Sequence, residues 1–295
     1  MAFNWKTFQT RTLTAIVFAA VMLVGLLWNH WSFLVLFSVI HFGCWWEYLK
    51  LTEKIYHTSF HFYLKLGLML IGYGLMLWFC GHQYELLGYG IRHSISLPVS
   101  IAGFILSLIG IYESKKVQPQ GFAAAGLGIL YISLSWGLML NLYSRALDVH
   151  IHDTLFVFGI GLFPILIIAC IWVNDTMAYI VGSFIGKTPL SKISPKKTWE
   201  GTVGGILLAV VIVMLVFPAI NNNYLYGPMM FLSGSIALIS SIFGTFGDLL
   251  ESKLKRMAGV KDSGSLMPGH GGFLDRFDSL LLAVPAVWLY VKLFI

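Results

Sequence analysis

Long apolar runs separated by short polar segments dominate the chain and predict membrane-spanning helices. A helix needs about 20 predominantly apolar residues to cross the hydrocarbon core of a membrane. Runs of about this length recur throughout the chain, and the short segments of alternating hydrophobicity that mark a membrane β-barrel are absent. The nine predicted spans lie at about residues 12–28, 31–46, 64–81, 95–112, 121–143, 155–173, 201–220, 229–247 and 279–295.

Composition excludes an ordinary soluble protein of this length. Of the 295 residues, 58% are hydrophobic and only 11% are charged, and the mean hydropathy is +0.80. Soluble globular chains are typically about 45–50% apolar and about 25% charged. We therefore predict an all-α, polytopic helical membrane protein with about nine transmembrane helices (about 8 to 10) and no separate soluble domain. Cys44, Cys80 and Cys170 lie inside apolar runs without metal-ligand spacing, so we expect small core side chains.

The distribution of basic residues predicts which ends of the spans face the cytoplasm. Cytoplasmic loops of membrane proteins carry an excess of lysine and arginine. With the N-terminus inside, 16 of the 19 Lys and Arg residues fall on the inside, and only Arg92, Arg145 and Lys292 fall on the outside. We therefore expect an integral membrane protein whose charge-rich segments face the cytoplasm.

Charged residues gather in two short parts of the chain and suggest how it is organised. Residues 175–200 and 248–278 together hold 16 of the 32 charged residues. We predict an N-terminal transmembrane scaffold of about five spans over 1–154. A transmembrane catalytic region over 155–295 would include the cytoplasmic segments 175–200 and 248–278. Because the charges are clustered in an otherwise apolar chain, the net charge of +6 does not indicate a nucleic acid partner.

Acidic and basic residues directly follow the predicted span 229–247. If the helix continues, Asp248, Glu251, Ser252 and Lys255 are spaced i, i+3, i+4 and i+7 and share one face. An unpaired carboxylate next to an apolar run is costly, which makes Asp248 a functional candidate. The alternative interpretation is a solvated helix end with local ion pairs.

A glycine-rich segment over residues 261–278 is suited to bind an anion. Its four glycines within nine residues bring backbone N–H groups close to a ligand, and a helix starting near Phe273 would add the positive end of its dipole. Asp275 and Asp278 are three residues apart on one face of that helix. The other candidates in this segment are Lys261, His270, Gly271, Gly272 and Arg276.

A third group of candidates begins with Asp175, which closely follows an apolar run and is a functional candidate for the same reason as Asp248. The chain continues with Lys187, Lys197 and Thr198, which suit phosphate binding although the GxxxxGK[ST] motif is absent. The alternatives are a structural lysine partner for Asp175 and attraction of the lysines to lipid headgroups.

Carboxylates beside lysines and arginines fit a site that binds a metal and an anionic ligand together. Asp248 and Asp275 would hold Mg²⁺, which usually takes one or two carboxylates plus substrate phosphates. Lysine and arginine side chains would neutralise the remaining phosphate charge.

The segment 252–278 resembles the signature of the phosphatidate cytidylyltransferases (CDP-diacylglycerol synthases). The resemblance implies a homodimeric integral membrane enzyme that converts CTP and phosphatidic acid into CDP-diacylglycerol and pyrophosphate. It also implies Mg²⁺ dependence, with Asp248 and Asp275 in the metal-binding positions. The matching residues are Ser252-Lys253-Leu254-Lys255-Arg256, Lys261-Asp262-Ser263-Gly264, Pro268-Gly269-His270-Gly271-Gly272 and Asp275-Arg276-Phe277-Asp278, with Asp175, Gly186-Lys187 and 194–201 upstream.

Two sets of candidate residues follow from the motifs and the resemblance. The predicted catalytic residues are Asp248, Asp275, Lys255, Arg276 and His270, and the first two are also the predicted metal ligands. The predicted substrate-binding residues are Asp175, Lys187, Lys197, Thr198, Lys261, Gly271, Gly272 and Asp278. Two alternative functions are a CTP-dependent membrane lipid kinase similar to dolichol or phytol kinases and, in another class, an ion-coupled transporter using Asp175 and Asp248.

Overall fold

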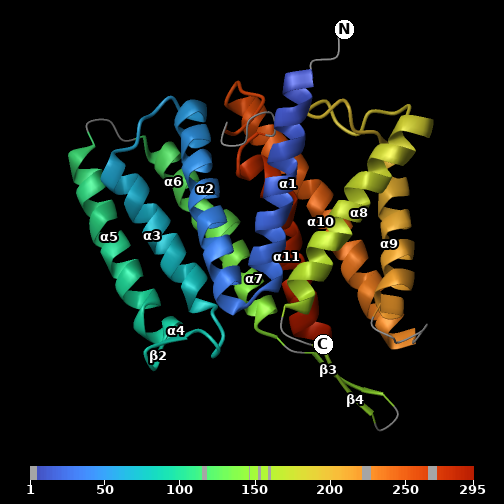
Figure 1. The fold of residues 1–295 in the computed structure, drawn as a ribbon. Helices are drawn as coiled ribbons and strands as arrows, with labels where there is room; N and C mark the ends of the chain where they lie inside the picture. Colours follow the sequence, from blue (N-terminus) through green and yellow to red (C-terminus); the bar gives the residue numbers. More distant parts are fainter. Residues whose placement is uncertain are drawn as a thin grey trace. The chain divides into compact units, whose positions relative to one another are not determined.

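A computed structural model describes residues 5–114, 118–145, 147–151, 154–158, 161–220, 227–264 and 271–295. Nearly all of the regular structure is helical (Figure 1). The helices are α1 (Trp5–Leu27), α2 (His30–Ile55), α3 (Phe62–Trp78), α4 (Ile91–Ser94), α5 (Ser96–Glu113), α6 (Pro119–Gly128), the π-helix η1 (Ile129–Leu134), α7 (Ser135–Tyr143), α8 (Leu162–Ile185), α9 (Trp199–Ile220), α10 (Gly227–Met257) and α11 (Leu274–Phe294).

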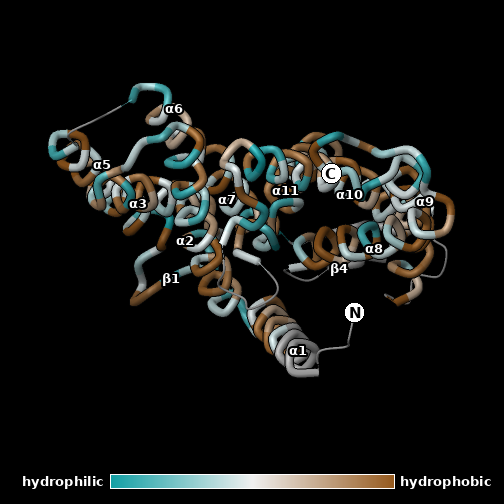
Figure 2. Tube along the Cα trace, turned by 90° about the horizontal axis from the view of Figure 1, so that it is seen from above, coloured by the Kyte–Doolittle hydropathy of each residue, from teal (hydrophilic) through white to brown (hydrophobic). Residues whose placement is uncertain are grey.

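The helices confirm a polytopic helical membrane protein. Within the described residues, seven helical segments are long and apolar enough to cross a membrane. The apolar parts of α1 and α3, Ile16–Leu27 and Phe62–Trp78, are helical but shorter. The predicted count of nine spans is therefore not confirmed. Hydrophobic residues dominate the helix traces in Figure 2, as expected for helices surrounded by lipid.

Two short hairpins depart from the all-helical prediction. Strands β1 (Glu85–Leu86) and β2 (Tyr89–Gly90) pair antiparallel, as do β3 (Leu147–Ile151) and β4 (Thr154–Phe158). The predicted span 155–173 is thus wrong at its start, because Thr154-Leu-Phe-Val-Phe158 combines β-branched and aromatic residues that favour a strand. Helix α8 begins only at Leu162, and it runs without interruption through Asn174 and Asp175 to Ile185.

The chain divides into two compact units. The first unit contains Met1–Ser144 and Leu254–Phe277, and the second contains Arg145–Lys253 and Asp278–Ile295. Helices α10 and α11 each contribute residues to both units.

Close packing of small residues joins α3 to α5 in the first unit. A Cβ atom on Gly67 or Gly103 would overlap the backbone of the opposite helix, so the two helices approach closely at these positions. The Ser96 hydroxyl donates a hydrogen bond of 2.9 Å to the Gly74 carbonyl oxygen. The contact leaves large apolar side chains of α5, such as Phe104, exposed to lipid.

Small residues also lie at the contacts of α8 with α9 and of α10 with α11 in the second unit. Gly205 of α9 lies against the backbone of Ala178 in α8. Gly247 of α10 lies against the backbone of Asp278 and Ser279 in α11. In the same unit, polar residues of α8, α10 and the segment before α9 line one cavity.

Candidate active site

A cavity of about 410 Å³ in the second unit contains several of the predicted site residues. Its polar lining comes from three parts of the chain: the middle of α8, the segment that precedes α9, and α10. Four of the predicted residues meet here although up to 73 sequence positions separate them. The polar lining residues include Asn174, Asp175, Lys196, Lys197, Thr198 and Asp248.

Lys197 and Asp248, which both line this cavity, form an ion pair. The Ser252 hydroxyl lies 3.3 Å from Oδ1 of Asp248, one helical turn further along α10. Both charged side chains remain partly exposed, so they are accessible to a ligand. Lys197 does not belong to α10. Asp248 thus pairs with a distant part of the chain and not with a lysine of its own helix.

The segment that carries Lys197 is held by its own hydrogen bonds. The Glu200 carboxylate accepts hydrogen bonds of 3.2 Å from the backbone N–H groups of Lys187 and Thr188. The Thr198 hydroxyl accepts one of 3.1 Å from the Gly201 N–H, which caps the start of α9. Lys187 itself is exposed and does not line the cavity. Of these two predicted lysines, only Lys197 therefore lines the cavity.

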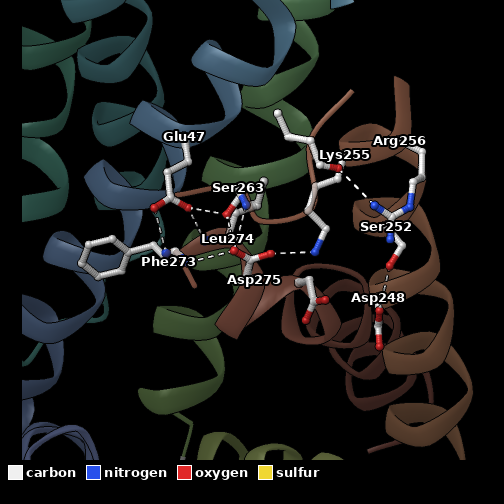
Figure 3. Close-up of polar contacts among 12 residues, drawn as sticks. Glu47, Asp248, Ser252, Lys255, Arg256, Ser263, Phe273, Leu274 and Asp275 are labelled. Carbon is white, nitrogen blue, oxygen red and sulfur yellow. Dashed lines mark hydrogen bonds and ion pairs between the residues drawn. The ribbon is translucent and has the colours of Figure 1, made fainter. Parts of the chain in front are cut away.

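Asp275 occupies a dense network in the first unit (Figure 3). Its Oδ1 accepts a 2.6 Å bond from the Lys255 ammonium. Its Oδ2 accepts bonds from the Ser263 N–H at 2.9 Å and the Gly272 N–H at 2.8 Å, and it lies 2.9 Å from the Ser263 hydroxyl. The backbone donors are the kind of anion-binding arrangement that the glycine-rich segment predicted, but here they bind the protein's own carboxylate.

Glu47 of α2 belongs to the same network and was missed by the sequence analysis. Its carboxylate accepts hydrogen bonds from the backbone N–H groups of Phe273 at 3.0 Å and Leu274 at 2.9 Å, and from the Ser263 hydroxyl at 2.7 Å. The residue is only 5% exposed. An acid directly after an apolar run was the available signal, as it was for Asp248. The predicted span ended at residue 46, which placed Glu47 in a loop.

The remaining predicted residues of these segments have diverse environments. Gly271 has φ +85°, a left-handed conformation that glycine adopts without strain. Lys261 and Arg276 are exposed, whereas Asp278 is buried and its Oδ1 accepts a 2.6 Å bond from the Ser279 N–H. His270 lies outside the described residues, so its predicted role stays a prediction.

Asp248 and Asp275 are carboxylates, the type of side chain that binds magnesium together with substrate phosphates. Over the described residues, no group of three His, Cys, Asp or Glu side chains forms a ready metal site. Mg²⁺ commonly needs only one or two carboxylates, because substrate phosphates and water supply the other ligands. Asp248 and Asp275 each accept a lysine ammonium, so each carboxylate binds a cationic group in this structure.

Comparisons with known proteins agree over nearly the whole chain. Residues 9–294 match the family described as the cytidylyltransferase family. A phosphatidate cytidylyltransferase of Thermotoga maritima is 30% identical over 290 residues, which cover 97% of this chain and 96% of that protein. Proteins of the same name are 40% identical in Synechocystis, over 66% of this chain and 64% of that protein, and 50% identical in Staphylococcus haemolyticus, over 65% and 68%.

Proposed function

Because the chain belongs to the cytidylyltransferase family, we propose that it transfers the cytidylyl group of CTP to phosphatidic acid. The products would be CDP-diacylglycerol and pyrophosphate. The name of the Thermotoga relative, which aligns over 97% of this chain, supports this choice. The structural observation that carries it is the cavity where Lys196, Lys197 and Asp248 meet beside apolar helices. It offers charged groups for phosphates within reach of a membrane-embedded substrate.

The proposed reaction is an in-line substitution at the α-phosphorus of CTP. An oxygen of the lipid phosphate bonds to that phosphorus, and the bond to the bridging oxygen of the β-phosphate breaks. Pyrophosphate leaves with the electron pair. Because the second pKa of a phosphate monoester is about 6, the nucleophile is already ionised at neutral pH and needs no strong base. The main barrier is repulsion between two anions, so catalysis depends on positioning and charge neutralisation.

The proposed roles of the basic residues follow from this charge problem. Lys197 lies in the cavity and would contact phosphate oxygens directly. Lys255 and Arg276 would do the same near Asp275, and Asp278 would orient Arg276 or serve as a further metal ligand. The departing pyrophosphate would contact His270 and the neighbouring glycines. The further substrate contacts that we propose are Asp175, Lys187, Thr198, Lys261, Gly271 and Gly272.

Magnesium is the proposed cofactor, and Asp248 and Asp275 are its proposed ligands. When bound, the ion would neutralise and orient the phosphate groups of both substrates. Asp275 is suited to this role because the N–H groups of Ser263 and Gly272 hold its Oδ2 and orient its Oδ1. Lys255 and Lys197 would then move from the carboxylates to phosphate oxygens.

We place this enzyme in the plasma (inner) membrane with its site on the cytoplasmic side, as a homodimer. Support for the orientation is the predominance of lysine and arginine in segments assigned to the inside. CTP is also a cytoplasmic nucleotide, so a site on that side would have direct access to it. The resemblance to the phosphatidate cytidylyltransferases supports the dimer.

Purified protein supplied with phosphatidic acid, Mg²⁺ and CTP labelled in the cytosine ring tests the proposed activity. We expect label in a lipid product and release of pyrophosphate, and no product when Mg²⁺ is removed by chelation. A lipid kinase would instead transfer only the γ-phosphate to a lipid alcohol and leave the base label in water. Ion flux in proteoliposomes without nucleotide would favour a transporter.

A further inference from the structure

We propose that Glu47 is a positioning residue for cytidylyl transfer, a proposal that rests on the proposed function above. Glu47 belongs to α2, within the N-terminal part of the chain that showed no candidate chemistry. Figure 3 shows its carboxylate directed toward Ser263, Phe273 and Leu274. These residues lie 216 to 227 positions further along the chain. Glu47 thus fixes the ends of the segment 263–274, which carries much of the predicted signature.

The glycines of this segment make room for the Glu47 carboxylate. A Cβ atom built on Gly264 or Gly272 would overlap the carboxylate atoms of Glu47. Both glycines are therefore required by a close approach to Glu47, in addition to any contact with substrate. Gly264 and Gly272 thus pack directly against the acidic side chain.

Glu47 also caps α11 from a different helix. Phe273 and Leu274 form the start of α11, where backbone N–H groups lack partners within the helix. Their bonds to Glu47 satisfy two such donors, and a negative charge at a helix N-terminus is favoured by the helix dipole. Asp275 directly follows Leu274, so this cap helps to position the proposed metal ligand in the first turn of α11.

Ser263 connects Glu47 to Asp275. Its hydroxyl oxygen is 2.7 Å from Oε2 of Glu47 and 2.9 Å from Oδ2 of Asp275. A hydroxyl has one proton and donates to one carboxylate at a time. The Ser263 N–H remains available to Asp275 in either case. A change at Glu47 should therefore alter the position of Asp275 by two routes. One is the Ser263 hydroxyl, and the other is the first turn of α11.

Glu47→Gln and Glu47→Asp together distinguish positioning from packing. Glutamine keeps the volume, but whichever way the amide is turned, its NH₂ group faces an N–H of Phe273 or Leu274. Aspartate loses a methylene but keeps two acceptor oxygens. We expect kcat per folded protein to fall about ten- to hundredfold in Glu47→Gln and to fall less in Glu47→Asp. The reverse order would show that Glu47 only fills space and would overturn the proposal.

Hydrogen exchange supplies a readout that does not depend on activity. We expect faster exchange of the Phe273 and Leu274 amides in Glu47→Gln, and unchanged exchange in Ser263→Ala, which keeps both backbone bonds. Ser263→Ala should nevertheless lower kcat, and this variant remains informative if Glu47→Gln fails to fold. Normal kcat in both variants would overturn the proposal.

Glu53→Gln is the matched control, because Glu53 lies on the same helix but bonds to Lys65 at 2.8 Å. We expect normal kcat and normal exchange at Phe273 and Leu274 in this variant. Equal losses of activity in Glu53→Gln and Glu47→Gln would overturn a specific role for Glu47. If wild-type protein makes no CDP-diacylglycerol, the proposed function fails, while the exchange measurements still report whether Glu47 orders the segment.

Discussion

A carboxylate at a membrane boundary needs a partner even before substrate arrives. Asp248 pairs with Lys197, and Asp275 pairs with Lys255 at 2.6 Å. Each lysine satisfies the carboxylate in the free protein and offers a positive charge to an incoming phosphate. Arginine would form a stronger bidentate contact with the carboxylate, whereas the single point charge of lysine exchanges partners more readily. The pairing therefore suits a site that must open when an anionic substrate binds.

Lys197 and Lys192 provide a residue-level test of the cavity. Both lie in the segment between α8 and α9, but only Lys197 lines the cavity and pairs with Asp248. We expect Lys197→Ala to lower kcat/KM for CTP by roughly 10²-fold, because it removes a charge from the proposed phosphate site. Lys192→Ala should leave kcat/KM unchanged. Equal losses would indicate general attraction by a basic loop and contradict a specific phosphate contact.

Local sequence identified some site residues and missed others for a physical reason. Asp175 and Asp248 stood out because charges beside apolar runs are costly, and Lys197 because it suits phosphate binding. The structure brings all three to one cavity. Glu47 gave the same signal, but its partners lie more than 200 residues away. Nothing in the local pattern indicates which distant N–H groups an acid will accept.

Among the elements, the predicted helix positions are more accurate than the predicted helix ends. Hydrophobic runs located the spans, but α2 continues to Ile55 and α10 to Met257, beyond the predicted ends at 46 and 247. Both extensions carry charged residues that a hydropathy pattern excludes, although helix propensity permits them. The site residues Glu47, Asp248 and Lys255 lie on these extensions. Asp248 and Lys255 were still predicted, because their spacing places them on one face of a continued helix, whereas Glu47 was missed.

The π-helix η1 is a second feature that the apolar pattern did not predict. It widens the helical run 119–143 and places Ser133 against two residues of α2. The Ser133 hydroxyl lies 2.8 Å from Nε1 of Trp45 and 2.9 Å from Nε2 of His41. This buried network links α2 to the following helices of the first unit. The hydropathy of an apolar run does not distinguish a π-turn from an α-turn, because it depends on composition and not on the number of residues per turn.

Replacement of Gly205 and of Gly126 by alanine should have opposite effects on stability. A Cβ atom on Gly205 would overlap the backbone of Ala178, whereas Gly126 of α6 has no atom within 4 Å of such a position. We expect Gly205→Ala to lower the free energy of unfolding by about 1–3 kcal/mol through overpacking. Gly126→Ala should raise it by up to about 1 kcal/mol, because alanine favours the helix. Thermal unfolding in detergent measures both, and a stabilised Gly205→Ala would contradict the close α8–α9 contact.

Across the whole chain, exposed apolar side chains confirm what the composition predicted. Large hydrophobic residues such as Phe104 in the first unit and Leu207 in the second are more than half exposed. Such surfaces would cause aggregation in water and are stable when lipid covers them. Composition was sufficient to predict this environment, because it sums over all residues. Which side of the membrane each loop faces depends instead on a few lysine and arginine residues.

Labelling of introduced cysteines tests the proposed orientation. The three native thiols are buried, so they should react poorly with the reagent. Tyr89 of β2 and Lys192 between α8 and α9 are exposed, and the Lys and Arg distribution places them on opposite sides. We expect a membrane-impermeant maleimide to label Tyr89→Cys in intact cells and Lys192→Cys only after the membrane is opened. The reverse pattern would place the Lys197 cavity on the outside, away from CTP, and would contradict both the orientation and the proposed reaction.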